Sequence, residues 1–294
     1  MKNSFLLIGI LFLLSSCIKN NPDPSWISIE EWSLVANPAL SSEEKVLTHN
    51  ITDAWVFVNG ETIGVFELPI NIPVLVSGNA NIQVFPAVLN NGISATKKIY
   101  PFLEPHVVQA DLVQNETLNI FPVTMYSSST KFNIEDFEGA SNVVTEGPSS
   151  NVIANTSTDP LILDPAINET KFLKVDINSS NDRWIASTKF NLSSINMPLP
   201  KGQEVYLEID YYNTNQVTSG LIGISATNQV NNPNVRLNPQ DLSEIKWKKI
   251  YIDLREVVSG LVSADYFEFS FDALLDDGQS SGIVCLDNMK AVYF

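Results

Sequence analysis

Cysteine and histidine side chains, which supply many of the nucleophiles and zinc ligands of proteins, are scarce in this chain of 294 residues. The cysteines are Cys17 and Cys285, and the histidines are His49 and His106. A structural zinc site needs four such ligands, and a cysteine nucleophile needs a histidine that activates it. We therefore expect neither chemistry, and we interpret Cys285, which lies in an apolar segment, as a buried strand residue.

Cys17 follows a segment that is typical of an export signal. The chain begins with one positive charge at Lys2, continues with an apolar run over residues 5–14, and then reaches Ser15, Ser16 and Cys17. At about 1.5 Å per residue the run is roughly 15 Å long, too short to cross a hydrocarbon core of about 30 Å. The sequence predicts a signal peptide over residues 1–16 and no membrane span.

Leu14-Ser15-Ser16-Cys17 resembles the lipobox of bacterial lipoproteins. The resemblance implies cleavage before Cys17, which would become the mature N-terminus and carry fatty acyl chains such as palmitate on its sulfur and its amine. Each buried CH₂ contributes about 0.8 kcal/mol, so two or more chains hold a protein stably at a membrane. The alternative is an ordinary signal peptide in which the cysteine is accidental.

Residues 17–25 form a short polar stretch with prolines at 22 and 24, which indicates a tether rather than a helix or strand. Within it, Lys19 and Asp23 resemble the surface-export signal that many Bacteroidetes lipoproteins carry after the cysteine. The resemblance implies a lipoprotein of the bacterial cell envelope at the outer membrane, either periplasmic or exposed on the surface.

The charge balance excludes one class of partner. The chain has 33 acidic and 17 basic residues, and removal of residues 1–16 would take away Lys2 alone. So acidic a protein is not expected to bind nucleic acid, which requires basic surface. Solubility is the plain explanation of the acidic surface, and binding of metal cations is the other.

The elements that must position the remaining side chains are strands. Alternating apolar and polar residues recur between turns of Asn, Gly, Pro and Ser, and no long segment has apolar residues at helical spacing. The length indicates about two domains. We predict an all-β protein with a β-sandwich over residues 26–126, a linker over 127–130 and a jelly-roll sandwich over 131–294.

Asn59-Gly60 marks the clearest hairpin of the first domain, because this dipeptide accepts the positive φ angles of a type I′ turn. Together with Gly64, Leu68-Pro69 and Ser77-Gly78, it resembles the PEGA domain, a short β repeat of bacterial envelope and surface-layer proteins. Immunoglobulin-like sandwiches show a similar pattern. The resemblance implies a scaffold or spacer without catalytic residues.

The second domain resembles the jelly-roll carbohydrate-binding modules, also called galactose-binding-like domains, over essentially its whole length. Four segments carry the resemblance, in the family's order: Asp136-Phe137-Glu138-Gly139, the strand over 205–212, the Trp-initiated strand over 247–254, and the closing strand over 283–292. The resemblance implies that this domain binds a polysaccharide.

In that family a calcium ion commonly joins the first and last strands. The resemblance places this structural Ca²⁺ at Glu138 and Asp287, with Asp136 as a third ligand, and backbone carbonyls would complete the six to eight oxygens that Ca²⁺ takes. The alternative is that these carboxylates only accept hydrogen bonds at strand ends.

The family binds sugars through exposed aromatic side chains. The candidates here are Trp184, Tyr211, Tyr212, Trp247 and Tyr251. Because side chains alternate along a strand, about half of them must point into the core. The alternative for each residue is therefore a place in the core.

Catalytic motifs are missing from the sequence: it contains no Gly-x-Ser-x-Gly, no His-Glu-x-x-His and no phosphate-binding glycine loop. We predict that the protein is not an enzyme. The leading hypothesis is a membrane-anchored envelope lipoprotein whose second domain binds a glycan. The alternative is a structural module that binds another envelope protein and no sugar.

Overall fold

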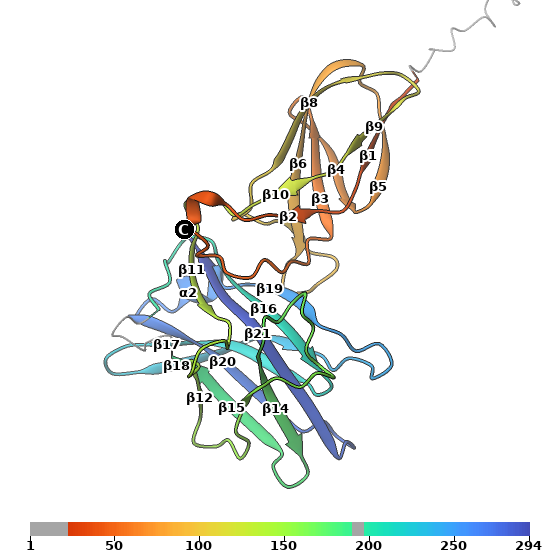
Figure 1. The fold of residues 1–294 in the computed structure, drawn as a ribbon. Coiled ribbons are helices and arrows are strands. Elements are labelled where there is room, and N and C mark those ends of the chain that lie inside the picture. The colour runs from red at the N-terminus through yellow and green to blue at the C-terminus, as the bar shows by residue number, and fades with distance from the viewer. Residues whose placement is uncertain (1–22, 190–196) are drawn as a thin grey trace, which may run out of the picture.

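The computed structural model describes residues 23–189 and 197–294, which form two β domains (Figure 1). Cys17 and the predicted signal peptide lie outside these residues. Apart from the 3₁₀ turn η1 (Pro38–Leu40) and the short helix α2 (Arg255–Gly260), the regular elements in the described ranges are strands. The predicted all-β class is therefore confirmed.

The first domain is built from two main sheets. Its strands are β1 (Ser25–Ile29), β2 (Ser33–Leu34), β3 (Asp53–Val58), β4 (Glu61–Glu67), β5 (Ile70–Val74), β6 (Gly78–Leu89), β7 (Lys97–Ile99), β8 (His106–Leu112), β9 (Thr117–Ile120) and β10 (Val123–Thr124). One sheet has the order β5-β1-β9, and the other has the order β4-β3-β6-β7 with β8 also paired to β6. Strands β3 and β4 form the predicted hairpin, in which Asn59 and Gly60 have φ angles of 54° and 82°.

The first sheet contains a parallel pair that joins distant parts of the sequence. Strand β1 pairs antiparallel with β5 and parallel with β9, and the small strand β2 pairs parallel with β10. Both ends of the domain's chain thus meet in one sheet. Alternate β1 side chains, Ile27 and Ile29, have no exposed surface and pack in the domain core.

The second domain is a sandwich of two sheets. Its strands are β11 (Lys131–Glu135), β12 (Val144–Glu146), β13 (Asn155–Ser157), β14 (Phe172–Asn178), β15 (Arg183–Thr188), β16 (Val205–Asn213), β17 (Val217–Ile224), β18 (Gln229–Leu237), β19 (Lys248–Asp253), β20 (Tyr266–Leu274) and β21 (Ser281–Tyr293). The order β13-β14-β21-β16-β19, with β11 on β21, defines what we call the junction sheet. The order β12-β15-β20-β17-β18 defines the distal sheet.

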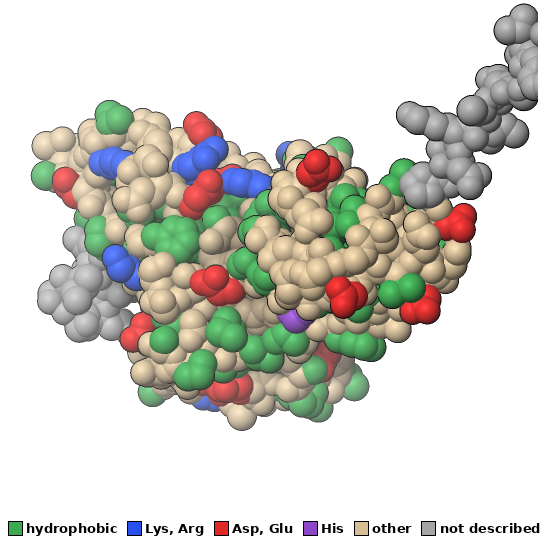
Figure 2. All heavy atoms as spheres, turned by 90° about the horizontal axis from the view of Figure 1, so that it is seen from above, with side chains coloured by type: hydrophobic (Ala, Val, Ile, Leu, Met, Phe, Trp, Pro, Cys, Tyr) green, Lys and Arg blue, Asp and Glu red, His purple; other side chains and the backbone are tan. Residues whose placement is uncertain are grey.

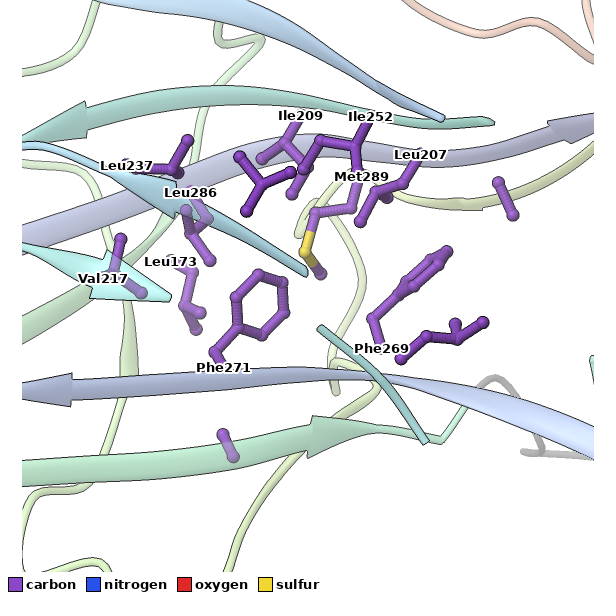
Figure 3. Close-up of a cluster of buried hydrophobic side chains, with 14 of the residues drawn as sticks. Leu173, Leu207, Ile209, Val217, Leu237, Ile252, Phe269, Phe271, Leu286 and Met289 are labelled. Atoms are coloured by element: carbon purple, nitrogen blue, oxygen red, sulfur yellow. The ribbon is translucent and has the colours of Figure 1, made fainter. Parts of the chain in front are cut away.

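Strands that follow one another in sequence mostly alternate between these two sheets, which is the connectivity of a jelly roll. Between the sheets lies an apolar core. Phe269 and Phe271 of β20 point from the distal sheet toward Leu286 and Met289 of β21 in the junction sheet (Figure 3). The jelly-roll fold that the sequence predicts for this domain is confirmed.

The outer face of the junction sheet is covered by the first domain. Tyr206 and Tyr251 of the second domain belong to the same buried cluster as Tyr100 and Phe102 of the first. The rings of Tyr100 and Tyr251 are 4.9 Å apart, and those of Tyr100 and Tyr206 are 5.1 Å apart. The two domains therefore share one apolar core at their junction.

A buried carboxylate lies inside this junction. Glu208 has no exposed surface, accepts hydrogen bonds from the hydroxyls of Tyr100 (2.6 Å) and Tyr126 (2.8 Å), and pairs with Lys249 at 3.1 Å. Burial alone would raise the pKa of Glu208, but Lys249, Lys290 and the two phenols together hold that pKa below its usual value. The carboxylate is therefore ionised and fully partnered.

Lys290 also enters the junction, from β21. Its ammonium group donates hydrogen bonds to the backbone carbonyls of Glu44 (2.6 Å) and Val46, and lies 6.0 Å from the centre of the Tyr126 ring. Burial lowers the pKa of Lys290 to about 8. Charged and aromatic groups of both domains thus interlock at the junction.

The rest of the outer face is covered by the segment 158–171. Phe172, Trp247 and Cys285 form a small buried cluster there, against which Ile162 and Ile167 of the segment pack. Cys285 is fully buried, as the sequence predicts, and burial raises the pKa of its thiol. On the face shown in Figure 2, acidic side chains are spread over both domains and do not gather in one patch.

Candidate ligand-binding groove

Within the described ranges the outer face of the distal sheet is accessible, and strict alternation on β20 explains the chemistry of this face. Phe267, Phe269 and Phe271 point into the core, so Glu268, Ser270 and Asp272 must point outward. The strand is therefore apolar on one face and polar on the other.

Strand register aligns polar residues of neighbouring strands into rows. In one row Asp272 is paired with Thr218, and Thr218 with Arg236. In the next row Ser187 is opposite Ser270, and Ser270 is opposite Gly220. These rows run across the strands, so a ligand lying over them would contact several strands at once.

A glycine keeps the floor of this face low. A Cβ atom at Gly220 would lie 2.7 Å from both the Asn232 carbonyl oxygen and the Ser270 hydroxyl, and 2.9 Å from Cα of Pro233. No side chain fits there without displacing backbone of β18. The missing side chain leaves a hollow in the middle of the sheet.

The hollow is a groove of about 840 Å³ that crosses the distal sheet. Its lining includes Thr145, Glu146, Ile185, Ser187, Lys189, Thr218, Gly220, Ile222, Gln229, Asn231, Pro233, Arg236, Tyr266, Glu268, Ser270 and Asp272. With strands about 4.8 Å apart, the width of five strands is about 19 Å. The groove therefore has room for an extended ligand.

The carboxylates of the groove already have partners. Glu268 accepts a hydrogen bond from the Ser187 hydroxyl at 2.8 Å, and Asp272 pairs with Arg183 at 2.9 Å. Glu146 accepts a hydrogen bond from the backbone N–H of Ala154 at 2.9 Å. By contrast, Lys189 and Arg236 have no ionic or hydrogen-bonding side-chain partner among the described residues.

Two of the predicted sugar platforms are buried. Trp184 has no exposed surface and stacks on Phe271 in the core at 5.7 Å, and Tyr251 is 2% exposed inside the domain junction. A ring without exposed surface cannot stack on a sugar, so neither ring is available as a platform in this structure.

The other predicted platforms also lie away from the groove. Trp247 is 8% exposed, and its indole N–H donates to the Ile162 carbonyl at 2.7 Å. Tyr212 packs on Trp247 with ring centres 5.9 Å apart, and Tyr211 packs against the main core. The groove lining contains none of the five predicted rings; among the described residues its tyrosine is Tyr266.

The predicted aromatic platforms do not identify the groove residues, which are mostly polar. The signal that could have found them is the run Tyr266–Leu274, in which phenylalanines alternate with Glu268, Ser270 and Asp272. In such a strand the phenylalanines mark the face that packs in the core, and the hydrogen-bonding side chains mark the outer face that a ligand could reach. This signal can be used without knowing which aromatic side chains are exposed.

The predicted calcium residues occupy the end of the sandwich near the segment 158–171. Asp287 is 1% exposed; its carboxylate accepts hydrogen bonds from the Asn168 side-chain amide at 2.5 Å and from the Asn288 N–H at 2.8 Å. Burial raises the pKa of Asp287 to about 8. Hydrogen bonds from Asn168 and Asn288 oppose this rise in the pKa, and the charges of Asp210 and Glu138 add to it.

Hydrogen-bond donors already surround these carboxylates. Glu138 accepts from the backbone N–H groups of Thr170 and Lys171, each at 2.7 Å, while Asp136 pairs with Lys45 at 3.5 Å. Within the described residues, no group of three or more His, Cys, Asp and Glu side chains is placed to hold a metal ion. The donors present thus fit hydrogen-bonded carboxylates better than calcium ligands, and the calcium site stays a prediction.

Neither a protein-family model nor a curated protein matches the sequence, but solved structures do. The family 11 carbohydrate-binding module from Clostridium thermocellum, solved with a β-1,3-1,4-mixed-linked tetrasaccharide, is 14% identical; the match covers 55% of this chain and 94% of the module, with a TM-score of 0.35. The family 30 module of a cellulosomal cellulase from the same organism is 11% identical over 55% of this chain and 96% of the module, with a TM-score of 0.40.

A third match comes from a structure described for the promiscuous specificity of carbohydrate-binding modules of the β-sandwich superfamily. It is 13% identical, covers 81% of this chain and 83% of that chain, and has a TM-score of 0.35. These structural neighbours are β-sandwich carbohydrate-binding modules. In the described part of the chain, no helix has the length and apolar character needed to cross a membrane.

Proposed function

We propose that this protein is a non-catalytic lipoprotein of the bacterial cell envelope that binds a glycan along the groove of the distal sheet. The groove itself carries the proposal. It is open, about 840 Å³ in volume, and lined by hydrogen-bonding side chains from neighbouring strands. A sugar presents hydroxyl groups that both donate and accept, and the lining offers both kinds of partner at Asn231, Arg236 and Asp272.

The spacing of Glu268 and Asp272, two of the three groove carboxylates, supports binding without hydrolysis. Glycosidases hold two carboxyl groups about 5–5.5 Å or 6.5–9.5 Å apart. Glu268 and Asp272 are on the same face of β20 but four residues apart, which is about 13 Å along a strand. Their partners, Ser187 and Arg183, also keep both groups in structural hydrogen bonds.

The test is affinity electrophoresis of the mature chain in gels that contain plant or bacterial polysaccharides. We expect retardation by at least one polysaccharide and its loss in Thr218→Trp, because a strand accepts Trp and the new ring would fill the groove. Lys131→Ala, an exposed change outside the groove, serves as control. Unchanged retardation of Thr218→Trp, or no retardation by any polysaccharide, would contradict the proposal.

Failure to bind any glycan would favour the alternative, a module that binds another envelope protein. That role predicts that a second envelope protein co-purifies with this one from detergent-solubilised membranes. The anchor is tested separately: Cys17→Ser should move the protein from the membrane fraction to the soluble fraction and abolish labelling with palmitate. Membrane association that survives this change would contradict lipidation at Cys17.

A further inference from the structure

Strand β8 lies at one edge of the larger sheet of the first domain (Figure 1). It pairs with β6 from Gly78 opposite Leu112 to Val84 opposite His106, without a register shift. On its other side, within the described ranges, it pairs with no strand. The backbone N–H and C=O groups on the outer side of an edge strand have no partner in the sheet, so they can bind an additional strand.

The hydrogen bonds of β6 show which groups of β8 point away from the sheet. The Asn81 carbonyl accepts from the Asn59 N–H at 2.8 Å, on the side of β6 that faces β3. Because the backbone groups of successive residues point to opposite sides of a strand, those of Ile82 point toward β8. Ile82 is opposite Val108, so the bonds to β6 use Val108 and every second residue from it. The residues between them direct their N–H and C=O groups outward: Val107, Gln109 and Asp111.

These outward groups are free in the described part of the chain, where no backbone or side-chain group bonds to them. Just ahead of them the edge is covered by the segment 123–126. The Glu104 N–H donates to the Met125 carbonyl at 2.9 Å, and the Val123 N–H donates to Nδ1 of His106 at 3.3 Å. The free part of the edge therefore begins at Val107.

The other long edges of this protein are blocked. Among the described residues, the edge strands of six or more residues are β4, β8, β18 and β19. A register shift interrupts the pairing of β4 and of β18, and β18 also contains Pro233. The edge of β19 is covered by the first domain, because the Asn91 N–H donates to the Tyr251 carbonyl at 2.9 Å. Strand β8 has no proline, no lysine and no register shift, which are features that commonly block an edge.

The geometry of the free edge fits an extended polypeptide. Its donors and acceptors recur every two residues, which is about 6.8 Å along an antiparallel strand. Another strand has the same repeat, and it offers an acceptor for each N–H and a donor for each C=O. In such an addition the backbone bonds supply affinity, and the side chains on both strands supply specificity.

The side chains along the free edge define the partner. Val107, Gln109 and Asp111 share one face of β8 and are exposed, and the exposed fraction of Val107 is 51%. Within the described ranges Asp111 has no ionic partner, nor do the exposed Glu104 and Glu116 beyond the two ends of the strand. The edge is therefore acidic. An added strand is favoured when it places a basic residue opposite Asp111 and an apolar residue opposite Val107.

A second copy of this chain does not meet these requirements. If two β8 strands paired antiparallel over all seven residues, Asp111 would lie opposite Val107 of the second copy. Neither carboxylate would then have a cationic partner, and each chain has a net charge of −16. We propose that the free edge of β8 binds another protein by strand addition, through an antiparallel segment with a basic residue opposite Asp111 and an apolar residue opposite Val107. This site is on the first domain and does not depend on the groove.

The test is fluorescence anisotropy of the labelled peptide acetyl-Thr-Thr-Lys-Val-Thr-Val-Ile-amide, titrated with the mature chain. In the antiparallel register its lysine lies opposite Asp111 and its isoleucine opposite Val107. We expect a Kd below about 1 mM. Gln109→Pro should raise that Kd at least about fivefold, because proline removes an outward N–H and its ring obstructs the edge, whereas the bonds to β6 do not use this group. The peptide with proline in place of the threonine opposite Gln109 should not bind.

Two controls separate strand addition from side-chain and charge effects. Gln109→Ala loses the same side-chain bonds to Asn79 and Asn81 as Gln109→Pro but keeps the N–H, so it should bind the peptide as the natural protein does. Asp111→Lys should weaken binding at least about threefold and should prefer the peptide with glutamate in place of lysine. Asp277→Lys makes the same change of charge at an exposed position of the second domain and should leave the Kd within about twofold.

Three outcomes would overturn strand addition at β8: no binding at about 1 mM protein, equal Kd values for Gln109→Pro and Gln109→Ala, or binding of the proline-containing peptide. A dimer in sedimentation that Gln109→Pro abolishes would overturn the assignment of the partner, because a second copy would then occupy the edge. The comparison of Asp111→Lys with Asp277→Lys introduces no proline into the sheet, so it decides the question even where Gln109→Pro does not fold.

Discussion

Lys290 shows how a single side chain of the junction can make stability depend on pH. Its folded-state pKa of about 8 lies below the value of 10.5 for a free lysine. Between these values the unfolded chain binds more protons than the native protein, so stability rises with pH. The contribution is complete above the unfolded pKa and is lost as the pH falls through about 8.

Lys290→Met should remove this dependence. Between about pH 7.5 and 9.5, the free energy of unfolding of the natural protein should rise relative to that of the variant by up to about 1.4 kcal/mol per pH unit. Urea unfolding at several pH values measures the difference. Lys131→Met, at an exposed lysine, is the control, and a flat difference curve would show that Lys290 titrates normally.

The calcium prediction also belongs to single residues. If Glu138 and Asp287 hold Ca²⁺, then CaCl₂ must raise the melting temperature of the full chain and EDTA must lower it, because an ion that binds the native state stabilises it. The gain is about 2.7 kcal/mol at a hundred times Kd. Glu138→Gln should abolish the response, whereas Glu256→Gln, at an exposed position, should not. A melting temperature that neither CaCl₂ nor EDTA changes would contradict the predicted calcium site.

The residue types in the sequence predicted the candidate site only in part. The sequence indicated the second domain as the part proposed to bind a ligand, but it selected Trp184 and Tyr251, whose rings the core and the junction bury. Exposure of an aromatic depends on which sheet face it occupies and on what covers that face. For Tyr251 the cover is the first domain, far away in the sequence, and no local pattern reports it.

Among the elements, the hairpin of β3 and β4 depends most directly on one dipeptide. Gly60 has a φ of 82°, and no atom lies within 4 Å of the point that a Cβ atom would occupy, so the cost of a side chain there is conformational and not steric. Gly60→Ala should lower the free energy of unfolding by about 1–2 kcal/mol. Gly260→Ala is the matched control: Gly260 also has open space but no positive φ, and it ends helix α2, so the change should leave stability unchanged or raise it by up to about 1 kcal/mol.

The positions of the strands were easier to predict from the sequence than the pairing between them. The alternation in the segments that became β16, β19 and β20 is plain in the sequence. Strand β18 is hard to recognise in the sequence, because its run Asn231-Asn232-Pro233-Asn234 is typical of a turn; it pairs at the sheet edge with a register shift between Ser219 and Gly220. The groove depends on that register, so its residues could not be aligned from the sequence.

At the scale of the whole molecule, the junction should make the two domains unfold together. Glu208→Ala would leave Lys249 buried with Asp210 as its remaining ionic partner at 3.6 Å, and loss of one member of a buried pair costs about 3–5 kcal/mol. We expect one urea transition, shifted to lower urea, whether the signal is fluorescence or proteolysis of either domain.

Glu256→Ala is the control for this experiment, because Glu256 is exposed and its pair with Arg255 should contribute at most about 1 kcal/mol. Two separate transitions, of which Glu208→Ala moves only one, would show that the domains are independent. The sequence predicted two domains with a linker between them, but it carried no signal that Tyr100, Tyr126 and Glu208 would meet. Such contacts depend on how two finished folds dock.

The position of β1 between β5 and β9 has a mechanical consequence. The described chain enters the first domain at the end remote from the second domain, and β1 then runs between an antiparallel and a parallel neighbour (Figure 1). A pull on the chain ahead of Ser25, with a ligand holding the second domain, would load both ladders of β1 in shear. Its backbone hydrogen bonds would then have to break together and not one after another, which is the arrangement that resists force most strongly.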